Sequence, residues 1–356
     1  MHGELRDSHG RVMRDLRVSI TDRCNFRCLY CLPETEEAAN FYRSKFDALR
    51  NPRPFALTPI QYDWKPKSEL LTFEEIERVV RIAAGMGIDK VRLTGGEPML
   101  RKGLENLVGQ LARVPGVHDL AMTTNGQLFA AKAHALRAAG LKRVSFSMDS
   151  LDRTNFRKLT GRDGLADVLA GIELAQQLGF QPVKVNAVII RDLNDHELEG
   201  LAEFAHERNL SLRFIEFMPL DSSRAWQGQL VVRGAEILTR LRARFDLRPA
   251  DQSLNPAETA RRWTFADGRG EIGIIAPVSE PFCGHCNRLR LTADGKLRTC
   301  LFSLEEHDLR PLLRDGPGDD AIAERLRDLV AHKEAGHRIG QPDFVQPART
   351  MSCIGG

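Results

Sequence analysis

Short β-rich runs alternate with amphipathic helical stretches from residue 16 to about residue 245. Such alternation predicts a parallel sheet with right-handed crossovers. Six strand–helix units suit an open, partial (β/α)6 barrel of the TIM type better than a closed barrel of eight. The predicted strands cover residues 16–20, 90–94, 119–123, 143–147, 183–190 and 211–217.

Helix signals support this pattern. Thr72 precedes an apolar-periodic stretch and Glu75 follows three residues later, which is the spacing of a capping box. Further helices are expected over residues 165–178 and 234–245, where apolar residues recur at helical spacing.

The alternation of strand and helix patterns ends at about residue 246. Short strand candidates at 262–265 and 271–275 flank Asp267-Gly268, and candidates at 288–292 and 296–300 flank Asp294-Gly295. Each pair predicts a β-hairpin. We therefore expect an α/β barrel domain over residues 1–245 and a smaller C-terminal α+β domain over residues 246–356.

Composition narrows the class of protein. The chain has 356 residues, of which 42% are hydrophobic and 28% charged, as in soluble globular proteins. A net charge of only +3 argues against a general nucleic-acid binder. No apolar run approaches the roughly 20 residues that span a bilayer, and the N-terminus lacks the apolar core of a secretory signal. We expect a cytoplasmic protein that binds neither nucleic acid nor membrane.

Six of the seven cysteines fall into two triads, which in a reducing compartment points to metal rather than to disulfides. Cys353 is expected to be incidental. The first triad, Cys24, Cys28 and Cys31, lies on one short loop. Three thiolates can hold an iron–sulfur cube and leave one iron open to a small molecule, although a zinc knuckle is the alternative for three cysteines alone.

This CxxxCxxC loop, with Tyr30 before its last cysteine, resembles the signature of radical S-adenosylmethionine enzymes. The resemblance implies that the open iron binds the cofactor's amino and carboxylate groups, and that electron transfer then yields a 5′-deoxyadenosyl radical. Gly95-Gly96-Glu97-Pro98 directly follows the strand at 90–94, at the sheet edge where a cofactor is expected. Glycines there let the backbone approach a ligand closely.

The second triad comprises Cys283, Cys286 and Cys300. Its spacing alone leaves zinc, with His285 or His307 as a fourth ligand, and a second cluster both open. Arg288 and Arg290 occupy alternate positions of a predicted strand, so both guanidiniums share one face and suit a polyphosphate.

Taken together, both triads, residues 92–98, residues 122–126 and the terminal Gly355-Gly356 resemble the GTP 3′,8-cyclase family of molybdenum-cofactor biosynthesis over nearly the whole chain. The resemblance implies a homodimer with two [4Fe-4S] clusters, one on each triad. The radical would remove hydrogen from ribose C3′ of GTP, and C3′ would attack C8 to give (8S)-3′,8-cyclo-7,8-dihydroguanosine 5′-triphosphate.

The family's contacts transfer onto matching positions. S-adenosylmethionine would contact Tyr30, Gly96, Ser147 and Met218. GTP would contact Arg17, Arg92, Thr123, Lys184, Arg288 and Arg290, with Arg213 as a further candidate. The catalytic set would be Cys24, Cys28, Cys31, Arg17, Arg288 and Arg290. The glycine tail would enter the active site.

The resemblance also implies partners: an electron donor such as flavodoxin or ferredoxin, and cyclic pyranopterin monophosphate synthase as the next enzyme. One departure is the long segment 32–69, which we interpret as a surface insertion. The alternative enzyme is another radical enzyme, with an auxiliary cluster, that acts on a peptide or RNA. A binding protein with two zinc modules ranks last, because it gives no role to Gly-Gly-Glu-Pro or to the six βα units.

Overall fold

The computed structural model describes residues 3–39, 58–221, 224, 226–251 and 256–355. Within them, twelve strands form one continuous sheet in the order β12-β11-β10-β1-β2-β3-β4-β5-β6-β9-β8-β7. The strands are β1 (Asp15–Ser19), β2 (Lys90–Thr94), β3 (Asp119–Thr124), β4 (Arg143–Ser147), β5 (Lys184–Ile189), β6 (Ser211–Glu216), β7 (Leu247–Pro249), β8 (Arg261–Phe265), β9 (Glu271–Ile275), β10 (Arg288–Leu291), β11 (Lys296–Arg298) and β12 (His307–Asp308).

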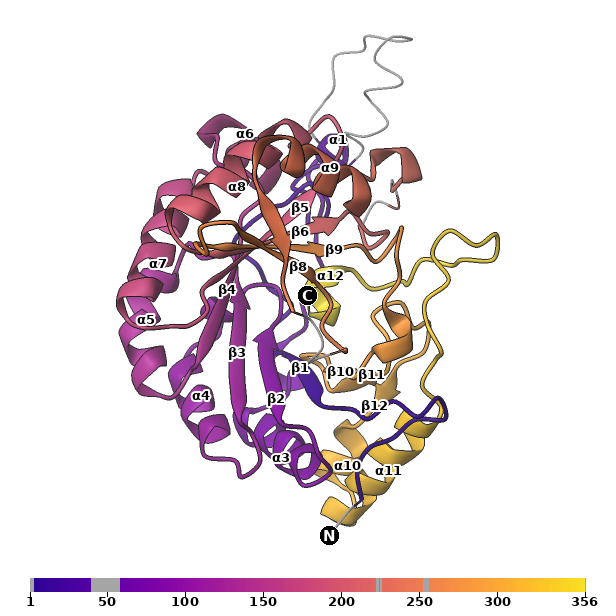
Figure 1. Cartoon of the computed structure of the whole chain (residues 1–356). Coiled ribbons are helices and arrows are strands. Elements are labelled where there is room, and N and C mark those ends of the chain that lie inside the picture. Colours follow the sequence, from indigo (N-terminus) through magenta and orange to yellow (C-terminus); the bar gives the residue numbers. More distant parts are fainter. Residues whose placement is uncertain (1–2, 40–57, 222–223, 225, 252–255, 356) are drawn as a thin grey trace.

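Helices cover the outer side of the curved sheet (Figure 1). The α-helices of the described chain are α1 (Glu36–Ala39), α3 (Phe73–Ala84), α4 (Leu104–Ala112), α5 (Phe129–Ala138), α6 (Arg153–Thr160), α7 (Leu165–Gln177), α8 (Leu198–Glu207), α9 (Gly234–Arg244), α10 (Arg310–Arg314), α11 (Asp319–Ala331) and α12 (Met351–Ile354). The last of these, α12, lies inside the curve of the sheet rather than on its outer side (Figure 1). No helix in the described part of the chain is both long and apolar enough to cross a membrane.

The six predicted strands are confirmed, each to within one residue at either end. They are parallel neighbours in chain order, as the strand–helix alternation requires. The capping box is confirmed too: Thr72 Oγ1 accepts from the Glu75 amide at 3.2 Å, and the Glu75 carboxylate accepts from the Thr72 amide at 2.7 Å. The helices expected at 165–178 and 234–245 are α7 and α9.

Both C-terminal hairpins are also confirmed, β8 with β9 and β10 with β11. The sequence did not predict where these hairpins attach: β9 pairs parallel with β6 while β10 pairs parallel with β1. Each hairpin therefore satisfies the free backbone groups at one edge of the barrel sheet. The division into domains at residue 245 stays a prediction, and the sheet itself continues across that point.

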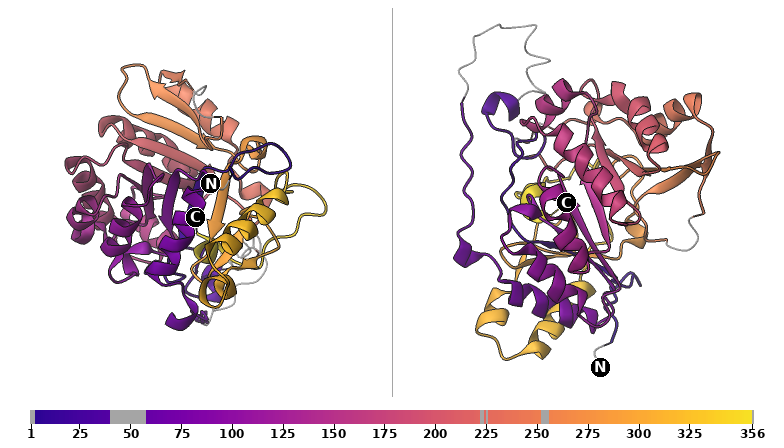
Figure 2. Two further views of the ribbon diagram at one scale, coloured as in Figure 1. Left: turned by 90° about the horizontal axis from the view of Figure 1, so that it is seen from below. Right: turned by 90° about the vertical axis from the view of Figure 1, so that its left-hand side faces the viewer.

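Residues 276–287 cross between the two opposite edges of the six-stranded barrel part of the sheet, since they connect β9 next to β6 with β10 next to β1. They include Cys283 and Cys286. The C-terminal helices return to the first barrel helix, where Arg78 of α3 donates to Asp319 of α11 at 2.7 Å (Figures 1 and 2). The second triad is thus built into the open side of the barrel.

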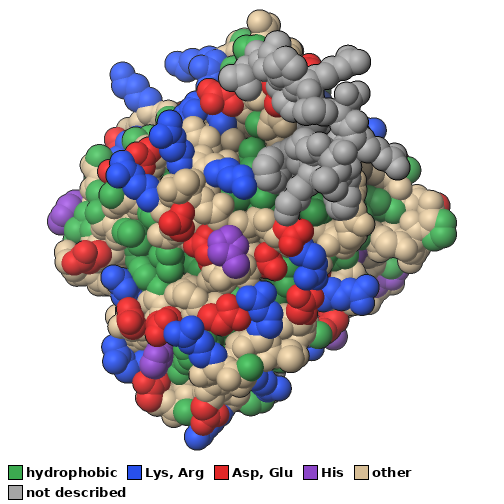
Figure 3. Space-filling view, turned by 90° about the horizontal axis from the view of Figure 1, so that it is seen from above, with side chains coloured by type: hydrophobic (Ala, Val, Ile, Leu, Met, Phe, Trp, Pro, Cys, Tyr) green, Lys and Arg blue, Asp and Glu red, His purple; other side chains and the backbone are tan. Residues whose placement is uncertain are grey.

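Charges on the face seen from above are mixed, with Lys and Arg side chains lying among Asp and Glu (Figure 3). Interhelical pairs of this kind include Arg240 of α9 with Glu199 of α8, at 3.0 Å. This face therefore presents no broad surface of one sign.

Candidate active site

The barrel strands separate apolar from polar side chains with a period of two. On β2, Val91 and Leu93 are fully buried in the main hydrophobic core, while Arg92 and Thr94 line an internal cavity. The other barrel strands repeat this arrangement, as with Val185 in the core and Lys184 at the cavity. A closed barrel normally packs its interior with branched apolar residues. Here the interior is polar and hollow, which is the property of a binding site.

The cavity has a volume of about 820 Å³, and every site residue nominated from the sequence lines it. These residues are Arg17, Cys24, Cys28, Tyr30, Cys31, Arg92, Gly96, Thr123, Ser147, Lys184, Met218, Cys283, Cys286, Arg288, Arg290 and Cys300. Arg213 lines it as well. The two triads, some 250 residues apart in sequence, therefore face one common space, although their individual roles stay predictions.

The first triad sits on a loop held by backbone hydrogen bonds. The amides of Arg27 and Leu29 donate to carbonyls at the end of α6, at 2.8 and 3.0 Å. Burial raises the pKa of Cys24 to about 11 and that of Cys31 to about 12. Thiols in such surroundings stay protonated until a metal displaces the proton, so three neighbouring, partly buried cysteines fit the ligand set of a cluster.

The Gly-Gly-Glu segment locks this loop to the sheet. A Cβ on Gly96 would lie 2.3 Å from the Arg23 carbonyl oxygen, so only glycine fits there. Glu97 accepts from the Asn125 amide at 2.7 Å and from Thr124 Oγ1 at 2.8 Å, and burial raises its pKa to about 7. The sequence assigned these glycines to the cofactor. In the structure their closest neighbour is the backbone of the cluster loop.

Asp149 is a site residue that the sequence did not nominate. It lines the cavity two residues after β4, accepts a hydrogen bond from the Tyr30 hydroxyl, and accepts another from the Val188 amide at 2.8 Å. Burial raises the pKa of Asp149 to about 6. An acidic residue just beyond a parallel strand is the signal that could have identified it.

The second triad lies in a different electrostatic environment. Burial raises the pKa of Cys286, but the charges of Arg288 and Lys333 outweigh it and lower the value to about 6. Arg288 also donates to Cys286 Sγ at 3.3 Å. Three cysteines with adjacent cations thus fit an anionic cluster, while His285 is exposed and neither it nor His307 lines the cavity.

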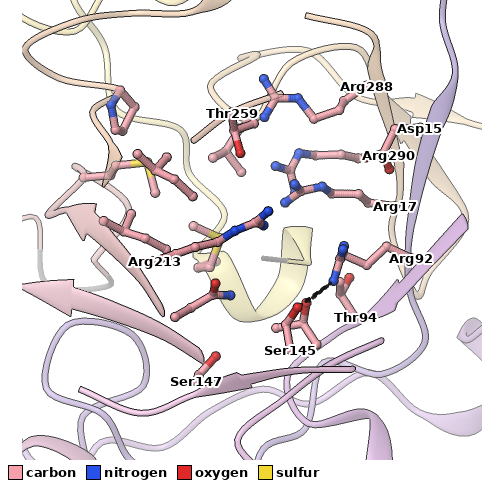
Figure 4. A pocket seen from close by; sticks show the side chains of 18 of the residues that line it. Asp15, Arg17, Arg92, Thr94, Ser145, Ser147, Arg213, Thr259, Arg288 and Arg290 are labelled. Carbon is pink, nitrogen blue, oxygen red and sulfur yellow. Dashed lines mark hydrogen bonds between the residues drawn. The ribbon is translucent and has the colours of Figure 1, made fainter. Parts of the chain in front are cut away.

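Cationic side chains from four strands point into the cavity, as Figure 4 shows for Arg17, Arg92, Arg213, Arg288 and Arg290. Burial lowers the pKa of Arg17 and of Arg92 to about 10. Within the described residues, the buried Nε atoms of Arg17 and Arg213 have no hydrogen-bond partner. Buried donors without partners are costly, so these five arginines, called the arginine wall below, are suited to a polyanionic ligand.

The C-terminal tail reaches the same cavity. Met351 and Ser352 line it, and Arg290 donates to the Gly355 carbonyl. Gly356 lies outside the described residues.

The second half of the insertion packs on the cluster loop, which the sequence did not reveal. The Lys65 amide donates to Asp22 Oδ2 at 2.7 Å, and the Arg27 guanidinium lies 5.9 Å from the Tyr62 ring centroid and 5.7 Å from that of Trp64. Residues 40–57 lie outside the described residues.

Two family models match consecutive parts of the chain: the Radical SAM superfamily over residues 18–205 and Molybdenum Cofactor Synthesis C over residues 210–339. Among solved structures, the fold is similar to that of Streptococcus suis SuiB bound to S-adenosylmethionine. The TM-score is 0.56 at 14% identity, covering 88% of this chain and 69% of that one. With the cysteine loop and the partial barrel, these matches place the chain in the radical S-adenosylmethionine superfamily, which implies a [4Fe-4S] cluster and that cofactor.

Curated relatives narrow the class. The GTP 3′,8-cyclase of Rhodopirellula baltica is 44% identical over 99% of this chain and 92% of its own length. The GTP 3′,8-cyclase of Acidothermus cellulolyticus is 45% identical over 92% of this chain and 84% of its own length. The GTP 3′,8-cyclase of Streptomyces coelicolor is 44% identical over 99% of this chain and 96% of its own length. The chain belongs to the GTP 3′,8-cyclase family.

Proposed function

We propose that this chain converts GTP to (8S)-3′,8-cyclo-7,8-dihydroguanosine 5′-triphosphate in molybdenum-cofactor biosynthesis. The observation that supports this most directly is the single cavity that both cysteine triads and the arginine wall line. A nucleotide held at one triad would face a cofactor held at the other, so the reacting groups would meet without diffusion.

On one side of the reaction, Cys24, Cys28 and Cys31 would hold a [4Fe-4S] cluster, and Tyr30, Gly96, Ser147 and Met218 would hold S-adenosylmethionine. When bound, the cluster and cofactor would supply a 5′-deoxyadenosyl radical that removes the C3′ hydrogen. The C3′ radical would then add to C8 of the same guanine, and one electron and one proton would complete the closed-shell dihydro product. The chain's own part is to fix the loop. Glu97 anchors it to the end of β3, and Asp149 holds the Tyr30 hydroxyl.

In the same cavity, Cys283, Cys286 and Cys300 would hold a second [4Fe-4S] cluster, whose open iron would receive the guanine base. Arg17, Arg92, Thr123, Lys184, Arg288 and Arg290 would bind the nucleotide. Burial lowers the pKa of Lys184 to about 7, and a triphosphate beside it would favour its charged form. Arg92 is already oriented by Ser145 Oγ at 3.2 Å and Thr123 Oγ1 at 3.3 Å (Figure 4).

The decisive experiment is anaerobic. Reconstituted protein receives S-adenosylmethionine, a reductant and GTP, and 5′-deoxyadenosine and GTP are followed together by chromatography and mass. Matched appearance of deoxyadenosine and a GTP isomer is the expected result. Formation of deoxyadenosine without loss of GTP would mean that the substrate is a different molecule. If protein that carries both clusters forms neither product, the proposed enzymatic activity is refuted.

We further propose that the chain acts in the cytoplasm as a homodimer. Flavodoxin or ferredoxin would supply the electron, and cyclic pyranopterin monophosphate synthase would take the product. The support is family membership and reducing chemistry, in keeping with seven cysteines that are all free.

A further inference from the structure

A short segment after α11 contacts the backbone beside all three cysteines of the second triad. Lys333 is only 2% exposed, and its Nζ donates to the Arg288 carbonyl at 3.1 Å and to the Thr299 carbonyl. Arg288 follows Cys286 by two positions, and Thr299 directly precedes Cys300. One ammonium group therefore joins the two backbone segments that bear these cysteines.

The next residues reach the third cysteine. Arg11 donates to the Cys283 carbonyl at 2.8 Å and to the Ala335 carbonyl at 2.9 Å, and Asp7 holds its Nε. A Cβ on Gly336 would lie 2.8 Å from Cys283 Cβ and 3.1 Å from Cys283 Sγ. The chain thus passes in direct contact with Cys283, where no side chain larger than hydrogen fits.

Within the described residues, the Lys333 ammonium donates to carbonyls and forms no ion pair with a carboxylate. The charge of Lys333 helps to lower the pKa of the neighbouring Glu334, but that carboxylate accepts its hydrogen bond from Thr299 Oγ1 instead. A buried ammonium is expensive unless an opposite charge lies near it. Three thiolates ligating a cluster would supply negative charge at this place, because Lys333 Nζ binds the backbone next to Cys286 and Cys300.

We propose that Lys333 is a positioning residue for the second cluster: it joins the Cys286 and Cys300 segments and supplies the counter-charge that sets the reduction potential of the cluster. This rests on the proposed second cluster. Removing a cation near an iron–sulfur centre disfavours the reduced state, which carries one more negative charge. Loss of the charge should therefore make the potential more negative.

Three substitutions at Lys333 distinguish its joining role from its counter-charge role. Lys333→Gln keeps donors for the two carbonyls but loses the charge, Lys333→Met loses both, and Lys333→Arg keeps both. Lys142→Met is the matched control, because Lys142 Nζ also donates to a backbone carbonyl, that of His118 at 2.7 Å, at an exposed position. Each protein is reconstituted anaerobically, its iron and sulfide are counted, and both clusters are titrated by electron paramagnetic resonance. A Cys283→Ser, Cys286→Ser, Cys300→Ser triple variant identifies the signal of the first cluster.

We expect the Gln variant to retain its iron with only the second potential shifted to more negative values, and the Met variant to lose the iron of the second cluster. The Arg and Lys142 variants should match wild type. Wild-type potentials in the Gln variant would refute the counter-charge, and full iron in the Met variant would refute the joining role. If the Lys333→Gln variant loses the second cluster and the Lys333→Arg variant keeps it, the counter-charge role of Lys333 is supported. If both variants lose the cluster, that role is refuted. Wild type with a single cluster would instead overturn the second cluster itself.

Discussion

Replacing Gly355 by alanine should release the C-terminal tail. Gly355 has φ of +85°, and a Cβ there would lie 2.3 Å from Thr94 Oγ1 and 3.1 Å from Ser19 Cβ. Thr94 and Ser19 are buried at the ends of β2 and β1, so neither can move aside freely. The tail must leave its place to accommodate the methyl group.

The size of the effect follows from what the docked tail loses. The Arg290 hydrogen bond to the Gly355 carbonyl is worth about 1.5–3 kcal/mol, as for other bonds to charged groups. A side chain in the left-handed region adds about 1–2 kcal/mol of strain. Together these amount to about 2.5–5 kcal/mol and shift the docking equilibrium by roughly two to four orders of magnitude, since about 1.4 kcal/mol is tenfold.

The control variant Gly340→Ala distinguishes the effect of backbone strain from the effect of a steric clash. Its φ of +83° is nearly the same, but nothing lies within 4 Å of the added Cβ. Hydrogen exchange over residues 350–355 measures docking, because the Gly355 amide is bonded to the Met351 carbonyl at 2.9 Å. We expect fast exchange and at least about tenfold slower GTP cyclisation for Gly355→Ala only. Wild-type protection and turnover in that variant would refute the reasoning.

Three further predictions concern the wall and the scaffold. The double change Arg288→Ala and Arg290→Ala should abolish the GTP isomer while the first cluster keeps its iron; normal product would contradict the assignment. Burial opposes ionisation of Asp15, yet neighbouring lysine and arginine charges outweigh it and lower its pKa to about 2. Asp15→Asn should therefore reduce the free energy of unfolding by about 2 kcal/mol at pH 7. A carboxylate whose pKa is lowered by folding stabilises the fold at pH values above its ordinary pKa near 4, so the deficit of the variant should shrink as the pH falls towards 2. If urea unfolding shows the same difference between wild type and variant at every pH, this prediction is disproved. Thr72→Ala should cost about 1 kcal/mol in thermal unfolding through loss of the capping box, whereas Thr239→Ala on an exposed helix face should cost less; equal losses would count against the cap.

Elements with strong local signals were predictable. The barrel strands follow from β-rich runs between amphipathic helices, and α3 follows from Thr72 and Glu75. The hairpins follow from Asp-Gly turns, but their attachment to opposite edges of the sheet does not. Edge pairing depends on free backbone groups, which every strand offers equally, so local sequence does not select the edge.

The candidate site divides in the same way. Cysteine spacing and the alternate arginines nominated residues that do line one cavity. Asp149, Glu97 and Lys333 were not nominated, because isolated acids and lysines are usually solvated surface residues. Only burial and partners distinguish them: Asp149 accepts from Tyr30, and Lys333 donates to carbonyls beside two cysteines.

The sequence by itself determined the candidate ligand sets and the local elements. The two triads, the Gly-Gly-Glu-Pro turn and the strand–helix rhythm are properties of neighbouring residues, and spacing alone expresses them. The tertiary structure decided that both triads face one space, because β9 and β10 extend opposite edges of the barrel and residues 276–287 connect them. It also decided which charges are buried without a partner. That property depends on which distant segments exclude water from a side chain, and pairwise spacing along the chain does not contain it.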